Sequence, residues 1–168
     1  MSLPTWYHAP ECHAGIGYDV HVLTAERKLV LGGVTVPYDK GLKGHSDADV
    51  LVHAIMDAIL GAAGLGDIGE HFPDKSRKYK GASSILLLKH VTGMAAKAGF
   101  TVVNVDVTLL AEAPKITPYK KQMVVNIAGA LGIDGARVNV KATTNEGLGF
   151  VGAGQGMAAY ATASLRKA

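Results

Sequence analysis

The segment spanning residues 44–66, GHSDADVLVHAIMDAILGAAGLG, constrains the fold of this chain more than any other. Ser46 or Asp47 is a suitable N-cap, Asp47 and Asp49 suit a first helical turn, and Gly64 is a suitable stop. Most of the helical surface is apolar, while one row of polar side chains recurs every four residues. We therefore expect a helix that buries most of its circumference and keeps one polar stripe.

The remaining segments alternate between strand and helix patterns. We expect strands over residues 14–23, 100–110, 137–144 and 156–165, a β-hairpin over 28–37, helices over 82–98 and 118–131, and a long irregular loop over 66–81. Strands that flank helices predict an α+β fold: one mixed four-stranded sheet with helices on one face, plus a small β-hairpin. The other face of the sheet would need a partner, and in so apolar a chain we expect another copy of itself.

Composition limits the classes of function. The 168 residues are 48% hydrophobic, enough for one domain, which we place at residues 14–168 after a flexible lead-in at 1–13. The net charge of +3 comes with one dense basic run, at residues 75–80 in the predicted loop, so we expect no nucleic-acid partner. No apolar run reaches the roughly 18 residues of a membrane span. With a single cysteine, Cys12, and no secretory signal, we expect a cytoplasmic protein.

A candidate metal site joins two of these elements. Asp19 and His21 lie two apart in a predicted strand and so point to the same face. His53 lies in the middle of the predicted helix and can supply a third ligand. Two imidazoles and a carboxylate with one open position suit zinc. The alternative for Asp19 and His21 alone is a polar strand end that faces solvent.

The polar stripe of the helix supports the metal hypothesis. His45, Asp49, His53 and Asp57 are spaced by four, so each lies about 40° around the helix from the last. Solvated helix faces are usually rich in Lys and Glu, whereas this row holds only His and Asp. Asp49 or Asp57 could orient a ligand imidazole through a hydrogen bond.

Two loops add further candidates. Asp67 and Asp74 are framed by glycines and suit the hydroxyls of a polyol, although aspartate also favours turns for structural reasons. Thr143, Thr144 and Glu146 follow a strand and enter a glycine-rich turn. Hydroxyls and a carboxylate there could hold a diphosphate and a second cation such as Mg²⁺.

These residues fall within blocks that resemble a known family. The blocks GYDVH, residues 31–69 ending in GDIG, FPD, NVDVT, APK, VNVKATTNE and LGF resemble the 2-C-methyl-D-erythritol 2,4-cyclodiphosphate synthases of the non-mevalonate isoprenoid pathway. The similarity runs from about Gly15 to Leu165, and the motifs DVH, HSDxDVxxH, GDIG and KATTxExxGF occur in the family's order and spacing.

The resemblance implies a reaction and an assembly. The enzyme would convert 4-diphosphocytidyl-2-C-methyl-D-erythritol 2-phosphate to the 2,4-cyclodiphosphate and release CMP. Asp19, His21 and His53 would hold zinc, and Glu146 would hold Mg²⁺ or Mn²⁺. His45 and Thr144 match the transition-state stabilisers. The family is a homotrimer with active sites between subunits, the metals coming from one subunit and the nucleotide pocket from the next.

The resemblance also implies a set of substrate contacts. Those for the methylerythritol part are Asp67, Ile68, Gly69, Phe72, Pro73, Asp74, Lys75 and Ser76. Those for the cytidine pocket are Ala111, Glu112, Ala113, Pro114, Lys115, Ile116, Thr117 and Thr143. Further contacts are Asp19, Val20, His21, His45, Ser46, Thr144, Asn145, Glu146 and Phe150.

Three positions depart from the family pattern. Ala153 and Tyr160 stand where many members have an Arg and a Glu facing the threefold axis, so an anion or isoprenoid-diphosphate site there is not implied for this chain. Gly147 stands where a Lys is frequent. Two other functions fit the same ligands: a zinc phosphohydrolase that uses metal-bound water, and a non-catalytic trimeric module that binds small anions.

Overall fold

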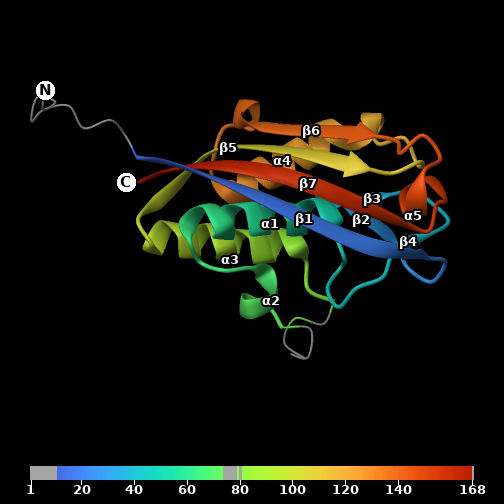
Figure 1. Ribbon diagram of the computed structural model, residues 1–168, viewed down its shortest axis with the longest axis horizontal. Helices are drawn as coiled ribbons and strands as arrows, with labels where there is room; N and C mark the ends of the chain where they lie inside the picture. The colour runs from blue at the N-terminus through green and yellow to red at the C-terminus, as the bar shows by residue number, and fades with distance from the viewer. Residues whose placement is uncertain (1–10, 74–78, 80, 168) are drawn as a thin grey trace, which may run out of the picture.

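A five-stranded sheet runs the length of the molecule in the computed structural model, which describes residues 11–73, 79 and 81–167 (Figure 1). The strand order is β4-β1-β7-β5-β6. The strands are β1 (Cys12–Thr24), β4 (Gly41–Leu42), β5 (Phe100–Leu110), β6 (Val138–Thr143) and β7 (Gly156–Lys167). Only β5 and β6 pair in parallel, so the sheet is mixed, as predicted.

The prediction of four strands was wrong by one. The additional strand, β4, is only two residues long and pairs with the end of β1 through Leu23 and Thr24. So short a strand has no periodicity that a sequence pattern can reveal. The strand expected at 14–23 is also longer than predicted and begins at Cys12, inside the expected lead-in, of which residues 1–10 lie outside the described part of the chain.

The predicted hairpin is confirmed as a separate two-stranded sheet of β2 (Leu29–Leu31) and β3 (Val34–Val36). Gly32 and Gly33 form its turn with φ of 55° and 70°. Positive φ at both central residues is the geometry of a type I′ turn, which glycine adopts without steric strain.

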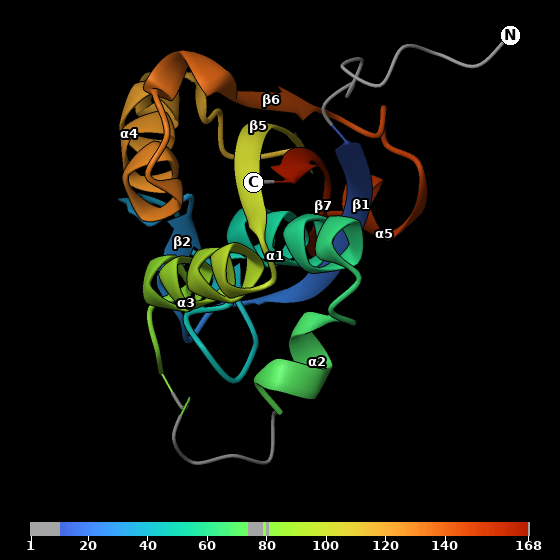
Figure 2. The ribbon, with the colours of Figure 1, turned by 90° about the vertical axis from the view of Figure 1, so that its left-hand side faces the viewer.

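Three long helices cover one face of the sheet (Figure 2). They are α1 (Val50–Ala63), α3 (Ser84–Lys97) and α4 (Lys120–Leu131), the last preceded by a 3₁₀ turn, η2 (Thr117–Tyr119). The three predicted helices are therefore confirmed. The short elements are α2 (Ile68–His71), η3 (Gly135–Arg137) and α5 (Gly149–Gly152). The region expected to be an irregular loop thus contains the helical turn α2.

The N-terminus of α1 differs from the prediction. Its N-cap is Asp49, whose carboxylate accepts from the Val52 N–H, rather than Ser46 or Asp47. Ala48 has a φ of 58°, so the preceding chain cannot be helical. The helix ends as predicted, at Gly64 in the left-handed conformation. His45 consequently lies in a loop before the helix and Asp49 at its cap.

Strand β1 lies unusually close to α1. A Cβ atom on Gly15 would stand 2.0 Å from the Ala58 carbonyl oxygen, and one on Gly17 would stand 1.9 Å from that of Ala54. Only glycine permits this approach of strand to helix. The same face of β1 carries Asp19 further along, so the close contact brings that strand face to the helix surface.

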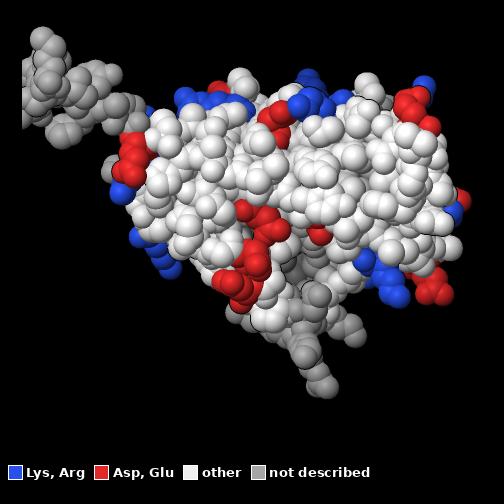
Figure 3. Space-filling view, in the orientation of Figure 1, with Lys and Arg blue, Asp and Glu red and all other residues white. Residues whose placement is uncertain are grey.

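The opposite face of β1 is exposed and apolar. Ile16 is 70% exposed and Val22 62%, and Tyr18 stacks on Tyr160 of β7 with ring centroids 4.8 Å apart. Viewed from this side, most of the surface over the sheet is uncharged (Figure 3). The prediction that one sheet face lacks a covering layer is confirmed for the described part of the chain. None of the helices in the described part of the chain combines the length and hydropathy of a membrane span.

Candidate metal centre and active site

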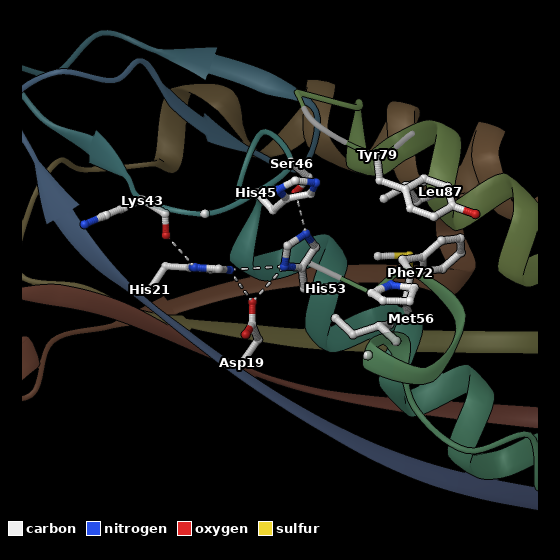
Figure 4. Close-up of a pocket in the computed structure, with 14 residues that line it drawn as sticks. Asp19, His21, Lys43, His45, Ser46, His53, Met56, Phe72, Tyr79 and Leu87 are labelled. Carbon is white, nitrogen blue, oxygen red and sulfur yellow. Dashed lines mark hydrogen bonds and ion pairs between the residues drawn. The ribbon is translucent and has the colours of Figure 1, made fainter. Parts of the chain in front are cut away.

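Three side chains converge at the junction of β1 and α1 (Figure 4). The Asp19 Oδ2 atom lies 3.0 Å from His21 Nε2 and 3.0 Å from His53 Nδ1, and the two ring nitrogens are 3.2 Å apart. The strand face next to the helix supplies Asp19 and His21, and the N-terminal end of α1 supplies His53. The structure therefore brings together the three predicted zinc ligands.

A carbonyl group orients the imidazole of His21. Its Nδ1 lies 2.8 Å from the backbone carbonyl oxygen of Lys43. Because a carbonyl oxygen only accepts, Nδ1 carries the hydrogen and the neutral ring presents an Nε2 lone pair toward Asp19 and His53. This is the tautomer that a metal ligand needs.

Asp19 supplies the negative charge of the cluster. Burial opposes ionisation of its carboxyl group, but the interactions with the adjoining imidazoles of His21 and His53 outweigh burial and hold its pKa well below the usual range. The carboxylate is thus anionic at neutral pH and available to a cation.

The donor set fits zinc. Ligand atoms about 2.0–2.1 Å from a tetrahedral Zn²⁺ stand about 3.3 Å from one another, and the three separations of 3.0–3.2 Å are close to that value. Two nitrogen ligands and one carboxylate also form a common set for a zinc site that keeps a position open. No other group of three such side chains was found among the described residues.

The cluster forms one wall of a cavity of about 590 Å³. Among the other predicted residues, the lining includes His45, Ser46, Ile68, Gly69, Phe72 and Pro73. The predicted contacts Asp74, Lys75 and Ser76 lie outside the described residues. Sequence reasoning missed five lining residues: Lys43, Gly44, Met56, Tyr79 and Leu87. Only Lys43 and Gly44 adjoin a motif, so only they had a sequence signal.

Comparison with known proteins identifies the family. The model of the YgbB family matches residues 12–166. A 2-C-methyl-D-erythritol 2,4-cyclodiphosphate synthase from Alkaliphilus oremlandii is 60% identical over 92% of this chain and 98% of its own length.

The chain belongs to the YgbB family.

Two solved structures agree with this assignment. The bifunctional IspDF from Campylobacter jejuni has a TM-score of 0.91 and 46% identity over 95% of this chain, which spans 43% of that longer protein. A CDP complex of IspF from Plasmodium falciparum has a TM-score of 0.81 and 33% identity, covering 93% of this chain and 96% of its own. The resemblance to the cyclodiphosphate synthases is thus confirmed.

A second group of predicted residues in this YgbB-family chain gathers where β5 and β6 end. The Ala111 N–H donates to the Thr143 carbonyl at 3.0 Å, and the Asn145 N–H donates to the Glu112 carboxylate at 2.8 Å. The Thr144 hydroxyl donates to the Glu146 carboxylate at 2.5 Å. Among the described residues, none of these six lines the cavity beside Asp19, so the two groups of predicted residues lie apart within one chain.

Val20 and Phe150 take a third position. They line a smaller hollow of about 480 Å³ together with His21, Val22, Gln155 and Gly156, so His21 borders both cavities. Val20 points away from Asp19 and His21 because neighbouring strand residues face opposite sides of the sheet. Its predicted substrate contact stays a prediction.

Asp49 and Asp57 do not orient the metal ligands as expected. The fully buried Asp49 carboxylate accepts from the N–H groups of Gly32 and Gly33 at 3.0 and 2.7 Å and so ties the hairpin to α1. Asp57 accepts from the Ile68 N–H at 2.8 Å and anchors α2. His53 instead directs Nε2 to the hydroxyls of Ser46 at 3.1 Å and Ser84 at 3.0 Å. Ser84 was not among the predicted site residues.

Proposed function

We propose that this chain closes the cyclodiphosphate ring of 2-C-methyl-D-erythritol 2,4-cyclodiphosphate from the cytidylylated 2-phosphate, with release of CMP. A phosphate oxygen of the substrate's own 2-phosphate attacks the β-phosphorus, and the bond from that phosphorus to the CMP oxygen breaks. The observation that supports this most strongly is the Asp19–His21–His53 cluster beside a cavity, in a chain 60% identical to a synthase.

Asp19, His21 and His53 would hold a zinc ion. A bound Zn²⁺ would act as a Lewis acid that polarises a phosphoryl oxygen and offsets the charge of the two phosphates. The residues around the cluster contact the ligands: the Lys43 carbonyl orients the ring of His21, and the hydroxyls of Ser46 and Ser84 bond the ring of His53. His45 and the loop at Ile68 and Gly69 line the space into which the substrate would fold.

Enforced proximity is the main contribution of such a cavity. The attacking and accepting phosphates belong to one molecule, and a pocket that folds them together can lower the barrier by on the order of 7–11 kcal/mol. No side-chain nucleophile is then required. The donors lining the cavity need only bind and orient an anionic substrate.

The second half of the site belongs to the same proposal. Glu146 would hold Mg²⁺ or Mn²⁺ across the diphosphate, and Thr144, whose hydroxyl bonds that carboxylate, would stabilise the transition state. The loop 111–117 with Thr143 would receive the cytidine, in line with the CDP complex of the Plasmodium falciparum protein. Because the two halves do not share one cavity within a chain, we propose a homotrimer in which neighbouring copies complete each site, and we expect it in the cytoplasm.

The proposal is tested by zinc analysis and a CMP-release assay on the purified chain. We expect zinc in the protein and CMP release from the cytidylylated substrate. Phosphorus NMR of the second product then separates the alternatives. A cyclic diphosphate supports the synthase, a linear phosphate would indicate a zinc phosphohydrolase, and no CMP release with both metals supplied would indicate a binding module.

A further inference from the structure

The imidazole of His53 has a second hydrogen-bonding side, which faces away from the metal cluster. His53 is 8% exposed, and its Nε2 lies 3.0 Å from the hydroxyl of Ser84, which is fully buried at the start of α3. The Ser84 hydroxyl in turn contacts the carboxylate of Asp47. Three side chains from three segments therefore form one continuous chain of hydrogen bonds.

The direction of these hydrogen bonds follows from Asp47. A carboxylate only accepts, so the Ser84 hydroxyl donates its one hydrogen to Asp47 Oδ1. The Ser84 oxygen can then only accept from His53, which places the ring hydrogen of His53 on Nε2. The neutral ring is left with a lone pair on Nδ1, the atom 3.0 Å from Asp19.

The second oxygen of Asp47 holds the chain in position. Its Oδ2 accepts from the Ser84 N–H at 2.9 Å, and the Asp47 N–H donates to the Ala82 carbonyl at 3.1 Å. Asp47 is therefore bound to both the backbone and the side chain of Ser84. A rigid two-point attachment of this kind keeps the hydroxyl from rotating toward His53.

We propose that Asp47 is a positioning residue that, through Ser84, fixes the tautomer and ring orientation of His53 and so raises the affinity of the chain for zinc. The inference rests on the zinc site of the proposed function. Ser46, the other hydroxyl near His53 Nε2, accepts from the Ala48 N–H at 3.1 Å and bonds no carboxylate among the described residues. It offers a second acceptor but does not impose a direction.

The test compares zinc affinity in four full-length chains by competition with a chelator. They are the wild type, Asp47→Asn, Ser84→Ala and Asp134→Asn. An asparagine at 47 cannot accept at both positions, so either the Ser84 hydroxyl or its N–H loses its acceptor. We expect Asp47→Asn to weaken zinc binding by about 10- to 100-fold, as loss of an outer-shell partner does. Ser84→Ala should weaken it less, because Ser46 can still accept from Nε2.

Asp134→Asn is the matched control. Like Asp47, Asp134 accepts from a backbone N–H at the start of a helical segment: its carboxylate binds the Ala136 N–H at 2.7 Å and caps η3, away from the cavity. It should lose some thermal stability and keep wild-type zinc affinity. If Asp47 only capped α3, both aspartate variants would behave alike.

A second readout separates positioning from stability. In the zinc-loaded protein, the Nε2–H proton of His53 should give a protected, downfield NMR signal that moves upfield in Asp47→Asn. Zinc affinity of Asp47→Asn equal to that of Asp134→Asn, or an unmoved signal, would overturn the inference. A wild type that binds no zinc would instead refute the metal centre itself.

Discussion

His53 carries the densest set of contacts at the residue scale, because one face of its ring meets Asp19 and His21 and the other meets two serine hydroxyls. Polar partners at both ring nitrogens hold this buried side chain in one orientation. Its neighbours on α1 are apolar and fill the core.

His53→Ala should abolish zinc binding and CMP release while leaving the chain folded. Removing a ligand should reduce activity by more than the roughly 100-fold that follows loss of an outer-shell partner. Zinc analysis, circular dichroism and the CMP assay measure these effects. His13→Ala is the control, since His13 bonds the Ala62 carbonyl and lies outside the cluster. Full turnover in a zinc-free His53→Ala chain would contradict the assigned site.

Glu146→Gln should leave zinc bound and weaken the response to the second cation. A neutral amide keeps the shape of the side chain but loses the charge that attracts Mg²⁺. The measurement is CMP release as a function of added Mg²⁺, with zinc content determined on the same samples. Stimulation by Mg²⁺ identical to that of the wild type would show that Glu146 does not bind this cation.

The buried carboxyl of Asp49 should make stability depend on pH. Burial raises its pKa to about 6, although hydrogen bonds from Gly33 and Gly32 oppose this shift. Between the ordinary value of 3.8 and about 6, the folded chain keeps this proton and the unfolded chain loses it. The free energy of unfolding should therefore fall as pH rises through this window, by on the order of 3 kcal/mol.

Urea denaturation of the wild type and Asp49→Asn between pH 4 and 7, with a chelator present, measures this effect. The asparagine variant should lack the contribution of this group to the slope. Parallel pH profiles in the two proteins would mean that the pKa of Asp49 is not raised.

At the scale of elements, the contact between β1 and α1 builds the metal centre. Gly15 and Gly17 let the strand lie against the helix backbone, and the next inward-facing residues, Asp19 and His21, then meet His53. The packing of two elements thus decides a ligand geometry that neither element contains alone.

Gly17→Ala should destabilise the fold and weaken zinc binding together. Its Cβ would stand 1.9 Å from the Ala54 carbonyl oxygen, so strand and helix must separate, at a cost of about 1–3 kcal/mol. Gly93→Ala, inside α3 with open space around it, should instead stabilise the chain by about 1 kcal/mol. Thermal unfolding and chelator competition on both variants provide the measurements. Unchanged zinc affinity in Gly17→Ala would show that the metal centre does not depend on this packing contact.

At the scale of the whole molecule, one face of the sheet leaves apolar side chains exposed to solvent. It exposes apolar side chains on a largely uncharged surface, whereas the helices cover the other face (Figures 2 and 3). Apolar patches of this kind usually mark contacts with other chains.

Ile16→Asp should dissociate the proposed trimer and abolish CMP release while each copy keeps its zinc. All three zinc ligands lie in one chain, whereas the nucleotide pocket would come from a neighbour. Val125→Asp is the control, because Val125 is 56% exposed on α4, in the helix layer. Light scattering with size-exclusion chromatography, zinc analysis and the CMP assay test this. A monomer with full activity would refute the shared active site.

The sequence by itself determined the elements and the ligand types. Alternation and helical spacing are local properties, so the three long helices, the hairpin and four of the five strands could be predicted, together with Asp19, His21 and His53. The spacing within β1 alone placed Asp19 and His21 on one face.

Only the tertiary structure decided how those parts meet. The Asp49 carboxylate caps α1 and bonds the hairpin turn, so the helix begins at Val50 and His45 lies in the loop before it. Three further features depend on residues far apart in the chain. They are the close contact between β1 and α1, the hydrogen bond between Ser84 and His53, and the distance of Glu146 from the metal cavity. No local pattern encodes such contacts, because their energies arise only when distant backbones pack together.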